Sequence, residues 1–248
     1  MIEHGTLEAN VTRHCINSCA CCSHASPISP RYFMEPKQLE KDIAGLKPFV
    51  HFKQFYLLGG EPLLHPRVCD LLDIVTASGI ANDTCMLTNG VLLNRVPPEF
   101  WDKVDFIRMS AYDKPNRSEV VAYAKKLCAE HNVGLGVDYI DLFWKQFKPS
   151  PDDGRASFAM CPWKGACWTV HDGHFYLCPG SAFYPDTIMS LPQNVDGLPI
   201  EGLTEQKFLD FINRKEPLRT CTICHSFKER NPWHEVHGRE AWIKDATL

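Results

Sequence analysis

Four cysteines occupy eight positions near the start of the chain, in the stretch HCINSCACCSH at residues 14–24. Three of them, Cys15, Cys19 and Cys22, follow a Cys-x3-Cys-x2-Cys spacing. Three thiolates on one loop can hold three irons of a four-iron cubane and leave the fourth iron open. A structural zinc site would need a fourth ligand, typically from a second Cys-x2-Cys pair. The spacing therefore leaves two kinds of metal site open.

A second set of cysteines lies in the last third of the chain: Cys161, Cys167, Cys178, Cys221 and Cys224. The stretch 167–179 predicts a β-hairpin, because its Asp-Gly pair is a strong turn signal between two strand-like runs. The Cys-x2-Cys pair some forty residues later has a spacing typical of metal ligands. Three isolated cysteines are expected to be small buried residues: Cys69, Cys85 and Cys128.

Short apolar runs alternate with amphipathic stretches between residues 6 and 142. The runs predict strands over 6–12, 53–60, 83–90, 104–112 and 133–140. Apolar residues at helical spacing predict helices around 37–50, 66–78 and 120–128. This alternation predicts parallel strands joined by crossover helices. The residues of interest all follow the carboxyl end of a strand, where such folds place their sites: Cys15, Gly59, Asn89 and Ser110.

The bulk composition argues against nucleic-acid and membrane partners. The 248 residues carry a formal net charge of −4, which indicates no basic surface. No apolar run approaches the roughly 20 residues that cross a bilayer, and the first residues lack the features of a signal peptide. We therefore expect a cytoplasmic protein, whose clustered cysteines bind metal because disulfides are rare in that compartment.

Gly59-Gly60-Glu61-Pro62 follows the second predicted strand. With the three-cysteine motif after the first strand, it resembles the radical S-adenosylmethionine (SAM) superfamily over residues 6–142. The resemblance implies an α/β fold, a partial (β/α) barrel of five or six parallel strands. It also implies a [4Fe–4S] cluster ligated by Cys15, Cys19 and Cys22, with SAM bound to the fourth iron.

The same resemblance assigns six residues to SAM binding: Gly59, Gly60, Glu61, Asn89, Ser110 and Arg117. Glycines let the backbone approach the ligand closely, and Glu61 would accept a hydrogen bond from the SAM ammonium group. The position before the third ligand is often aromatic in this superfamily, but here it is Cys21. Cys21 is expected to be a small packing residue, and a redox or hydrogen-donor role for it stays open.

The C-terminal cysteines resemble those of a twitch domain, a shortened SPASM domain. The resemblance implies a second [4Fe–4S] cluster on four thiolates: Cys161, Cys178, Cys221 and Cys224. Cys167 does not fit the family spacing. The implied organisation is a barrel at 1–146 and an auxiliary cluster domain with a C-terminal tail at 147–248. The alternative is a structural zinc site, for which further ligands would be His225, His234 or His237.

Length, motif position and auxiliary spacing are similar to those of the 2-deoxy-scyllo-inosamine dehydrogenases. This likeness implies two-electron oxidation of a sugar or cyclitol hydroxyl, with the auxiliary cluster as electron acceptor. The implied partners are a small polyol and an electron donor such as flavodoxin or ferredoxin. A base is also needed, and the candidates are Arg155, Asp138, Tyr139, His171 and His174.

Three other functions stay open. A radical SAM epimerase would use Cys167, left without a ligand role, to return a hydrogen to the substrate. Modification of a ribosomally made peptide is less favoured, because the first strand begins too early for a preceding peptide-recognition domain. An iron–sulfur or zinc scaffold would not cleave SAM, and the Gly-Gly-Glu-Pro segment argues against it. The tail at 226–248 is expected to cover the active site or to dock a partner.

Overall fold

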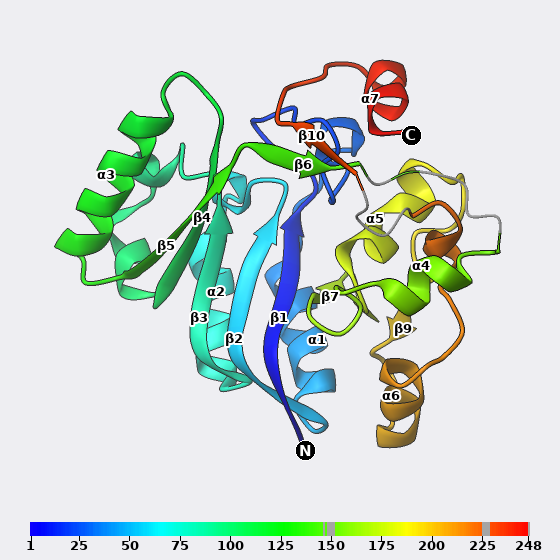
Figure 1. Ribbon diagram of the computed structural model, residues 1–248. Helices are drawn as coiled ribbons and strands as arrows, with labels where there is room; N and C mark the ends of the chain where they lie inside the picture. Colours follow the sequence, from blue (N-terminus) through cyan, green and yellow to red (C-terminus); the bar gives the residue numbers. More distant parts are fainter. Residues whose placement is uncertain (146, 148–151, 225–228, 248) are drawn as a thin grey trace.

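The fold is built on one sheet of eight strands, in the order β5-β4-β3-β2-β1-β7-β8-β9 (Figure 1). The computed structural model describes residues 1–145, 147, 152–224 and 229–247. Six strands are parallel: β1 (Ile2–Thr12), β2 (Val50–Gly59), β3 (Ala81–Thr88), β4 (Phe106–Tyr112), β5 (Gly134–Ile140) and β7 (Trp168–His171). Two short antiparallel strands continue the sheet beyond β7: β8 (His174–Tyr176) and β9 (Leu198–Pro199). The predicted partial barrel of five or six parallel strands is confirmed.

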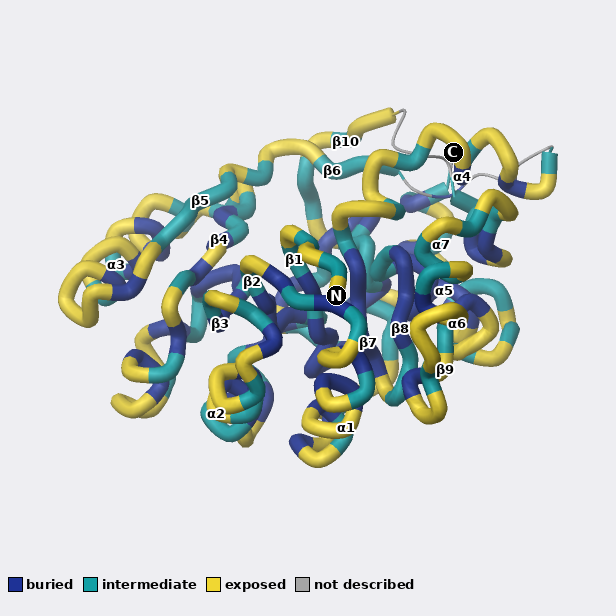
Figure 2. The backbone as a smooth tube through the Cα atoms, turned by 90° about the horizontal axis from the view of Figure 1, so that it is seen from below, coloured by how far each residue is buried: buried dark blue, intermediate teal, exposed yellow. Residues whose placement is uncertain are grey.

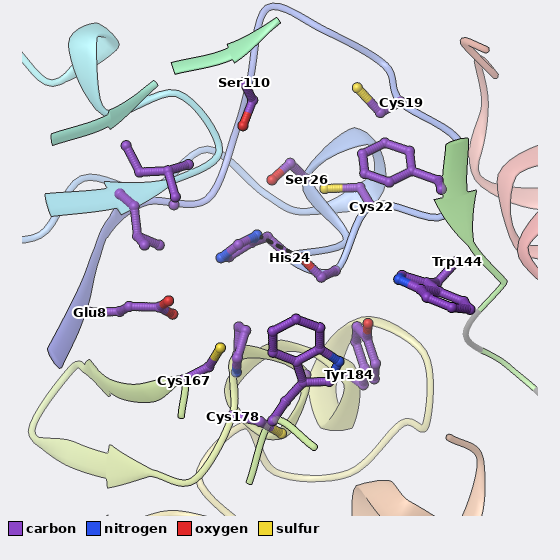
Figure 3. Close-up of a pocket in the computed structure, with 18 of the residues that line it drawn as sticks. Glu8, Cys19, Cys22, His24, Ser26, Ser110, Trp144, Cys167, Cys178 and Tyr184 are labelled. Carbon is purple, nitrogen blue, oxygen red and sulfur yellow. Dashed lines mark hydrogen bonds between the residues drawn. The ribbon is translucent and has the colours of Figure 1, made fainter. Parts of the chain in front are cut away.

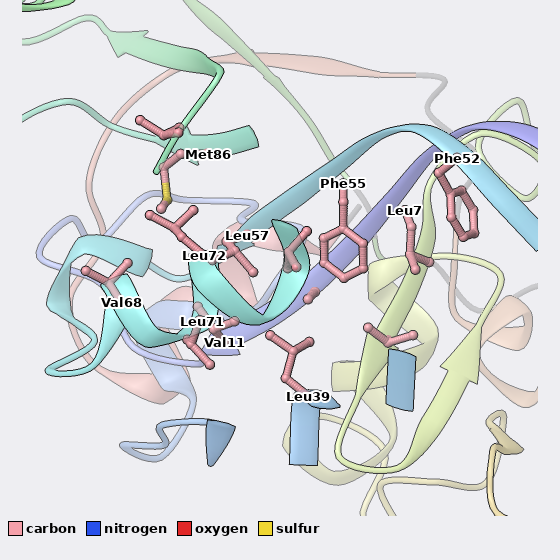
Figure 4. Packing of buried hydrophobic residues seen from close by; sticks show 14 of the residues in the cluster. Leu7, Val11, Leu39, Phe52, Phe55, Leu57, Val68, Leu71, Leu72 and Met86 are labelled. Atoms are coloured by element: carbon pink, nitrogen blue, oxygen red, sulfur yellow. The ribbon is translucent and has the colours of Figure 1, made fainter. Parts of the chain in front are cut away.

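Three helices connect the first strands and lie on one side of the sheet: α1 (Pro36–Leu46), α2 (Val68–Ser78) and α3 (Arg117–Glu130) (Figure 2). Apolar residues of the strands face these helices and form the main core, in which Leu7, Phe55 and Leu57 pack with Leu39 and Leu71 (Figure 4). Successive residues of a strand point to opposite faces of the sheet. The strand residues that alternate with these core residues therefore face the concave interior of the barrel.

The predicted hairpin at 167–179 is present as β7 and β8. Its turn residues, Asp172 and Gly173, have φ angles of 48° and 79°, which are the positive values that a two-residue hairpin turn favours. The buried carboxylate of Asp42 on α1 accepts a hydrogen bond of 3.2 Å from the Gly173 amide. This contact ties the hairpin to the first helix of the barrel.

The chain after β5 contains further short elements. They are β6 (Leu142–Trp144), α4 (Arg155–Met160), α5 (Pro179–Thr187), α6 (Glu205–Ile212), β10 (Arg230–Pro232) and α7 (Arg239–Ala246). β6 and β10 form a separate antiparallel pair. Within the described ranges, no helix is long and apolar enough to cross a membrane.

The strands β7 to β9 lie in the same sheet as the barrel strands. The expected domain boundary, between 146 and 147, falls next to residues outside the described part of the chain. The division into a barrel and an auxiliary domain therefore stays a prediction.

Candidate active site

A cavity of about 390 Å³ opens at the carboxyl end of the barrel. The first cysteine group lines one side: Cys15, Cys19 and Cys22. The second group lines the other side: Cys161, Cys167, Cys178, Cys221 and Cys224. Figure 3 shows Cys22 and Cys178 on opposite sides, with His24 between them. The fold thus brings all seven predicted cluster ligands to one cavity, although up to about two hundred residues separate them along the chain.

The first cysteine group lies on the loop that follows β1. The Cys15 sulfur accepts hydrogen bonds from the Asn17 amide (3.4 Å) and the Asn89 side-chain amide (3.8 Å). Burial, followed by the nearby Glu61 carboxylate, raises the pKa of Cys15 to about 12. Cys15 and Cys22 also help to raise the pKa of Cys19, so the three sulfurs lie near one another. Metal binding must therefore displace protons from these thiols.

Gly59 and Gly60 pack against the start of this loop. The Gly60 amide donates to the Thr12 carbonyl (3.0 Å), and the Glu61 amide donates to the His14 carbonyl (3.0 Å). A Cβ atom on Gly59 would lie 2.1 Å from the Thr12 oxygen, and one on Gly60 would lie 2.0 Å from the His14 oxygen. The glycines are thus needed for the approach of two backbones, in addition to any approach to a ligand.

Glu61 is fully buried and is not among the residues that line the cavity. Its carboxylate accepts hydrogen bonds from the Leu63 amide (3.1 Å), the Thr88 hydroxyl (2.6 Å) and the Asn89 amide (2.9 Å). Burial raises its pKa to about 7, against these hydrogen bonds, which lower it. In this structure Glu61 joins the ends of β2 and β3. The expected contact with the SAM ammonium group stays a prediction.

Four other residues assigned to SAM binding lie along the cavity wall next to Cys15: Gly59, Gly60, Asn89 and Ser110. Arg117 lies elsewhere. Its guanidinium pairs with Asp113 (2.6 Å) and Asp141 (2.7 Å), and its Nε donates to the Tyr112 carbonyl. Arg117 therefore holds the loop after β4 in place and does not line this cavity.

The second cysteine group comes from three short segments. Cys161 ends α4, Cys178 precedes α5, and Cys221 lies in a 3-10 helix at Arg219–Thr222. Cys161 is among the groups that raise the pKa of both Cys178 and Cys221. The neighbours of Cys167 are instead Glu8 and Arg108, together with Cys161. Cys161 thus lies near Cys178, Cys221 and Cys167, and its role as the fourth ligand stays a prediction.

A buried carboxylate orders the Cys221 turn. Asp196 accepts hydrogen bonds from the Arg219 amide (2.6 Å), the Thr220 amide (2.7 Å) and the Thr220 hydroxyl (2.6 Å). Gly154 packs against the same turn, where a Cβ would lie 2.6 Å from the Cys221 carbonyl carbon. These contacts position Cys221 before any metal binds.

The zinc alternative calls for ligands gathered around one centre. In the part of the chain that the structure describes, no group of three His, Cys, Asp or Glu side chains is close enough to hold one metal ion. Zinc requires four ligands within about 2.3 Å of one centre, whereas a cubane takes one thiolate at each of its separated irons. Of the histidines expected for a zinc site, His225 lies outside the described residues.

Comparison with known proteins identifies the N-terminal part. Residues 9–116, which contain the three-cysteine loop and the Gly59–Pro62 segment, match the Radical SAM superfamily. The chain contains a radical SAM domain. The superfamily implies a [4Fe–4S] cluster and SAM, and the cysteine loop and the adjoining wall of the cavity fit both.

Relatives of known activity match short segments only. A GTP 3',8-cyclase from Trichormus variabilis is 45% identical over 53 residues, which are 21% of this chain and 16% of that protein. A GTP 3',8-cyclase from Chlorobaculum tepidum is 33% identical over 85 residues, 34% of this chain and 26% of that protein. The chain thus matches about a quarter or less of the length of these relatives.

Two solved structures share the fold over most of the chain. BtrN in complex with AdoMet and 2-DOIA has a TM-score of 0.55 at 13% identity, covering 85% of this chain and 82% of BtrN. A histidine-tagged form of anSMEcpe with bound AdoMet has a TM-score of 0.55 at 14% identity, covering 99% of this chain and 96% of anSMEcpe. At such low identity these matches establish the architecture alone.

The C-terminal segment encloses the cysteine loop of the radical SAM domain. Ser18 exchanges backbone and side-chain hydrogen bonds with Val236, at 2.8 and 2.6 Å. The Trp242 indole donates to the Cys19 carbonyl (2.9 Å) and is completely buried. Lys114 bridges Asn17 and Glu235 (2.8 and 3.0 Å). Figure 1 shows β10 and α7 beside the loop after β1.

Sequence reasoning missed several residues of the cavity. Glu8 on β1 points into it, and His24 and Ser26 lie at its centre (Figure 3). His24 Nε2 and the Ser26 hydroxyl are buried without a hydrogen-bond partner among the described residues. The available signal was in strand β1, where polar Glu8 and Asn10 alternate with the apolar residues Leu7, Ala9 and Val11.

Of the five candidate bases, only Asp138 lines the cavity. It is paired with Arg108 at 2.6 Å. Tyr139 is 57% exposed, and His171 is buried with its Nδ1 at 3.0 Å from the Asn10 carbonyl. His174 Nδ1 lies 3.0 Å from the Asp172 carbonyl oxygen. Arg155, the fifth candidate, begins α4.

Asp196→Asn should destabilise the cluster-free protein by about 1–3 kcal/mol, because an amide cannot accept all three hydrogen bonds of the Cys221 turn. The free energy of unfolding in urea measures this loss. Asp210→Asn, on the exposed face of α6, is the matched control and should change stability by less than about 0.5 kcal/mol. Equal effects of the two substitutions would contradict the assigned role of Asp196.

Trp242→Ala should loosen the cysteine loop selectively. Loss of the buried indole costs about 3–5 kcal/mol and removes the hydrogen bond to Cys19. Hydrogen exchange of residues 16–22 should therefore become faster than in Trp101→Ala, which removes a buried tryptophan from the main core. Equal exchange of this loop in both variants would show that Trp242 contributes only to global stability.

Proposed function

We propose that the chain is a radical SAM enzyme that oxidises a hydroxyl group of a sugar, cyclitol or similar polyol by two electrons. The main support is the placement of two cysteine groups on opposite sides of one cavity. Further support comes from BtrN, which shares the fold and was crystallised with 2-DOIA. A flavodoxin or ferredoxin is the expected electron donor.

The two sides of the cavity would have different roles: one would bind the first cluster and SAM, and the other would bind the electron acceptor. Cys15, Cys19 and Cys22 would hold the first cluster, and the Gly59–Gly60 backbone with Ser110 would position SAM beside it. When bound, these cofactors would supply a 5′-deoxyadenosyl radical that removes a hydrogen atom from the substrate.

The opposite side would bind the electron acceptor, a second cluster. Its ligands would be Cys161, Cys178, Cys221 and Cys224. Aromatic residues, among them Phe143, Trp144 and Tyr184, line the cavity as well and would limit the access of water to the substrate.

Anaerobic reconstitution should give about eight irons and eight sulfides per wild-type chain. Replacing Cys15, Cys19 and Cys22 by alanine should leave about four. The control is the triple alanine variant of Cys69, Cys85 and Cys128, which should retain about eight irons. About four irons in wild type and none in the cysteine-loop variant would contradict a second cluster, and the oxidation would lose its electron acceptor.

Epimerisation is the second candidate function, and the position of Cys167 supports it. Cys167 lines the cavity near Glu8 (Figure 3). Burial, followed by the charge of Glu8, raises its pKa to about 12, which keeps the thiol protonated at neutral pH. A protonated thiol can donate a hydrogen atom to a substrate radical, so Cys167 would be the donor in this reaction.

Cys167→Ala distinguishes the two reactions. If the enzyme oxidises its substrate, the variant should form ketone at a rate close to that of wild type, measured by mass spectrometry of the product. If it epimerises, turnover should stop after hydrogen removal. Cys69→Ala controls for loss of a thiol outside the cavity. If Cys167→Ala lost ketone formation while iron analysis showed both clusters intact, this would contradict the expectation that oxidation does not require Cys167.

A further inference from the structure

The proposed oxidation requires a proton acceptor, and the inference below rests on that proposed function. When an alcohol carbon loses a hydrogen atom, a carbon radical that carries the hydroxyl group remains. To become a ketone, this radical must lose one electron, which a cluster held by Cys161, Cys178, Cys221 and Cys224 would accept, and the hydroxyl proton. A side chain that touches the substrate must receive that proton.

Glu8 has the right position. It lies on β1, and its carboxylate points into the cavity between the two cysteine groups (Figure 3). The Thr169 hydroxyl on the neighbouring strand β7 donates to its Oε2 at 3.2 Å. No hydrogen bond to its Oε1 is made by the described residues, so this oxygen is available to a substrate hydroxyl. Thr169 fixes the carboxylate and leaves one acceptor oxygen for the reaction.

The surroundings of Glu8 suit proton transfer. The titratable groups that face it from the neighbouring elements are Tyr56 on β2, Arg108 on β4, Asp138 on β5, and Cys167, which precedes β7. Burial raises the pKa of Glu8 to about 7, although Thr169 and Arg108 lower it. A base with a pKa near the working pH accepts and releases protons efficiently.

The other acceptors in the cavity are less suitable. Asp138 forms an ion pair with the Arg108 guanidinium at 2.6 Å, so this carboxylate already has a strong partner. His24 is the remaining competitor, because its buried Nε2 has no partner among the described residues. The experiment therefore includes a His24 variant. His24 lies on the cysteine loop, two residues after Cys22.

We propose that Glu8 is the catalytic base that accepts the hydroxyl proton of the substrate during oxidation. The carboxylate becomes a carboxylic acid as the carbon–oxygen double bond forms, and it then returns the proton to water. This role also explains why an acid lies between Leu7 and Ala9, which are both completely buried.

The experiment compares wild type with Glu8→Gln and His24→Gln, each reconstituted with iron and sulfide. The probes are 2-DOIA and scyllo-inositol, both deuterated at the carbinol carbons. Deuterium in 5′-deoxyadenosine reports hydrogen removal, and mass spectrometry of the ketone reports the complete oxidation. Glu3→Gln is the matched control, because Glu3 lies on the same strand but is exposed and contacts only His51 among the described residues.

For Glu8→Gln, deuterium transfer in a single turnover should stay within about threefold of wild type, while ketone formation falls by about 10²-fold or more. The ketone rate of wild type should rise with pH through about 7, since Glu8 accepts a proton only when it is ionised. In Glu8→Gln this rise should be absent. Glu3→Gln should form ketone with the rate and pH dependence of wild type, and His24→Gln should keep the rise with pH whatever its rate.

A second measurement needs no cofactor. In the cluster-free protein, the carboxyl carbon of Glu8 should titrate near pH 7 by NMR, with Glu8→Gln providing the assignment. Titration near the ordinary value of 4.5 would contradict the role of Glu8.

The outcomes separate this role from the proposed function. A wild-type enzyme that transfers no deuterium from either polyol overturns the function, and the role of Glu8 with it. An active wild type with normal ketone formation in Glu8→Gln overturns the role alone. Loss of deuterium transfer in Glu8→Gln would make Glu8 a binding residue, and loss of ketone only in His24→Gln would assign the base to His24.

Discussion

The close backbone contact between Gly59–Gly60 and the loop after β1 is the constraint on which the site depends. Two hydrogen bonds join these segments, and their separation leaves no room for a Cβ atom. Glu61 then carries the connection to the end of β3 through its buried carboxylate. The carboxyl ends of β1, β2 and β3 are therefore joined to one another, and this connection fixes the position of the backbone at Cys15.

The two faces of the sheet have different energetic roles. The face toward the helices is apolar and supplies most of the hydrophobic stabilisation. The concave face carries polar residues, among them Glu8, Arg108, Ser110 and Asp138, and a buried polar group there costs stability unless it has a partner. Asp138 and Arg108 satisfy one another, whereas Glu8 has one neutral hydrogen bond. Such an uncompensated acid is typical of functional sites, where stability is given up for chemistry.

Much of this arrangement could be predicted from local patterns. The five barrel strands and their helices follow from periodicity, and the Asp172-Gly173 turn follows from its residue types. Glu8 was missed because its position inside the barrel depends on which face of β1 the helices cover. β6 and β10 have only three residues each, too few for a detectable period. Contacts of Trp242 and Glu235 with the cysteine loop depend on folding over more than two hundred residues, which no local signal encodes.

The enclosure of the cysteine loop by the C-terminal segment has a consequence for biogenesis. Residues 15–22 leave the ribosome early, but Trp242 and Val236, which enclose them, are made more than two hundred residues later. During synthesis the loop is therefore open to solvent and to oxidants. The contacts that enclose the loop can form only after the last helix has been synthesised. A nascent chain that stalls before β10 would present unprotected thiols, so the order of synthesis sets the order in which the metal site can be completed.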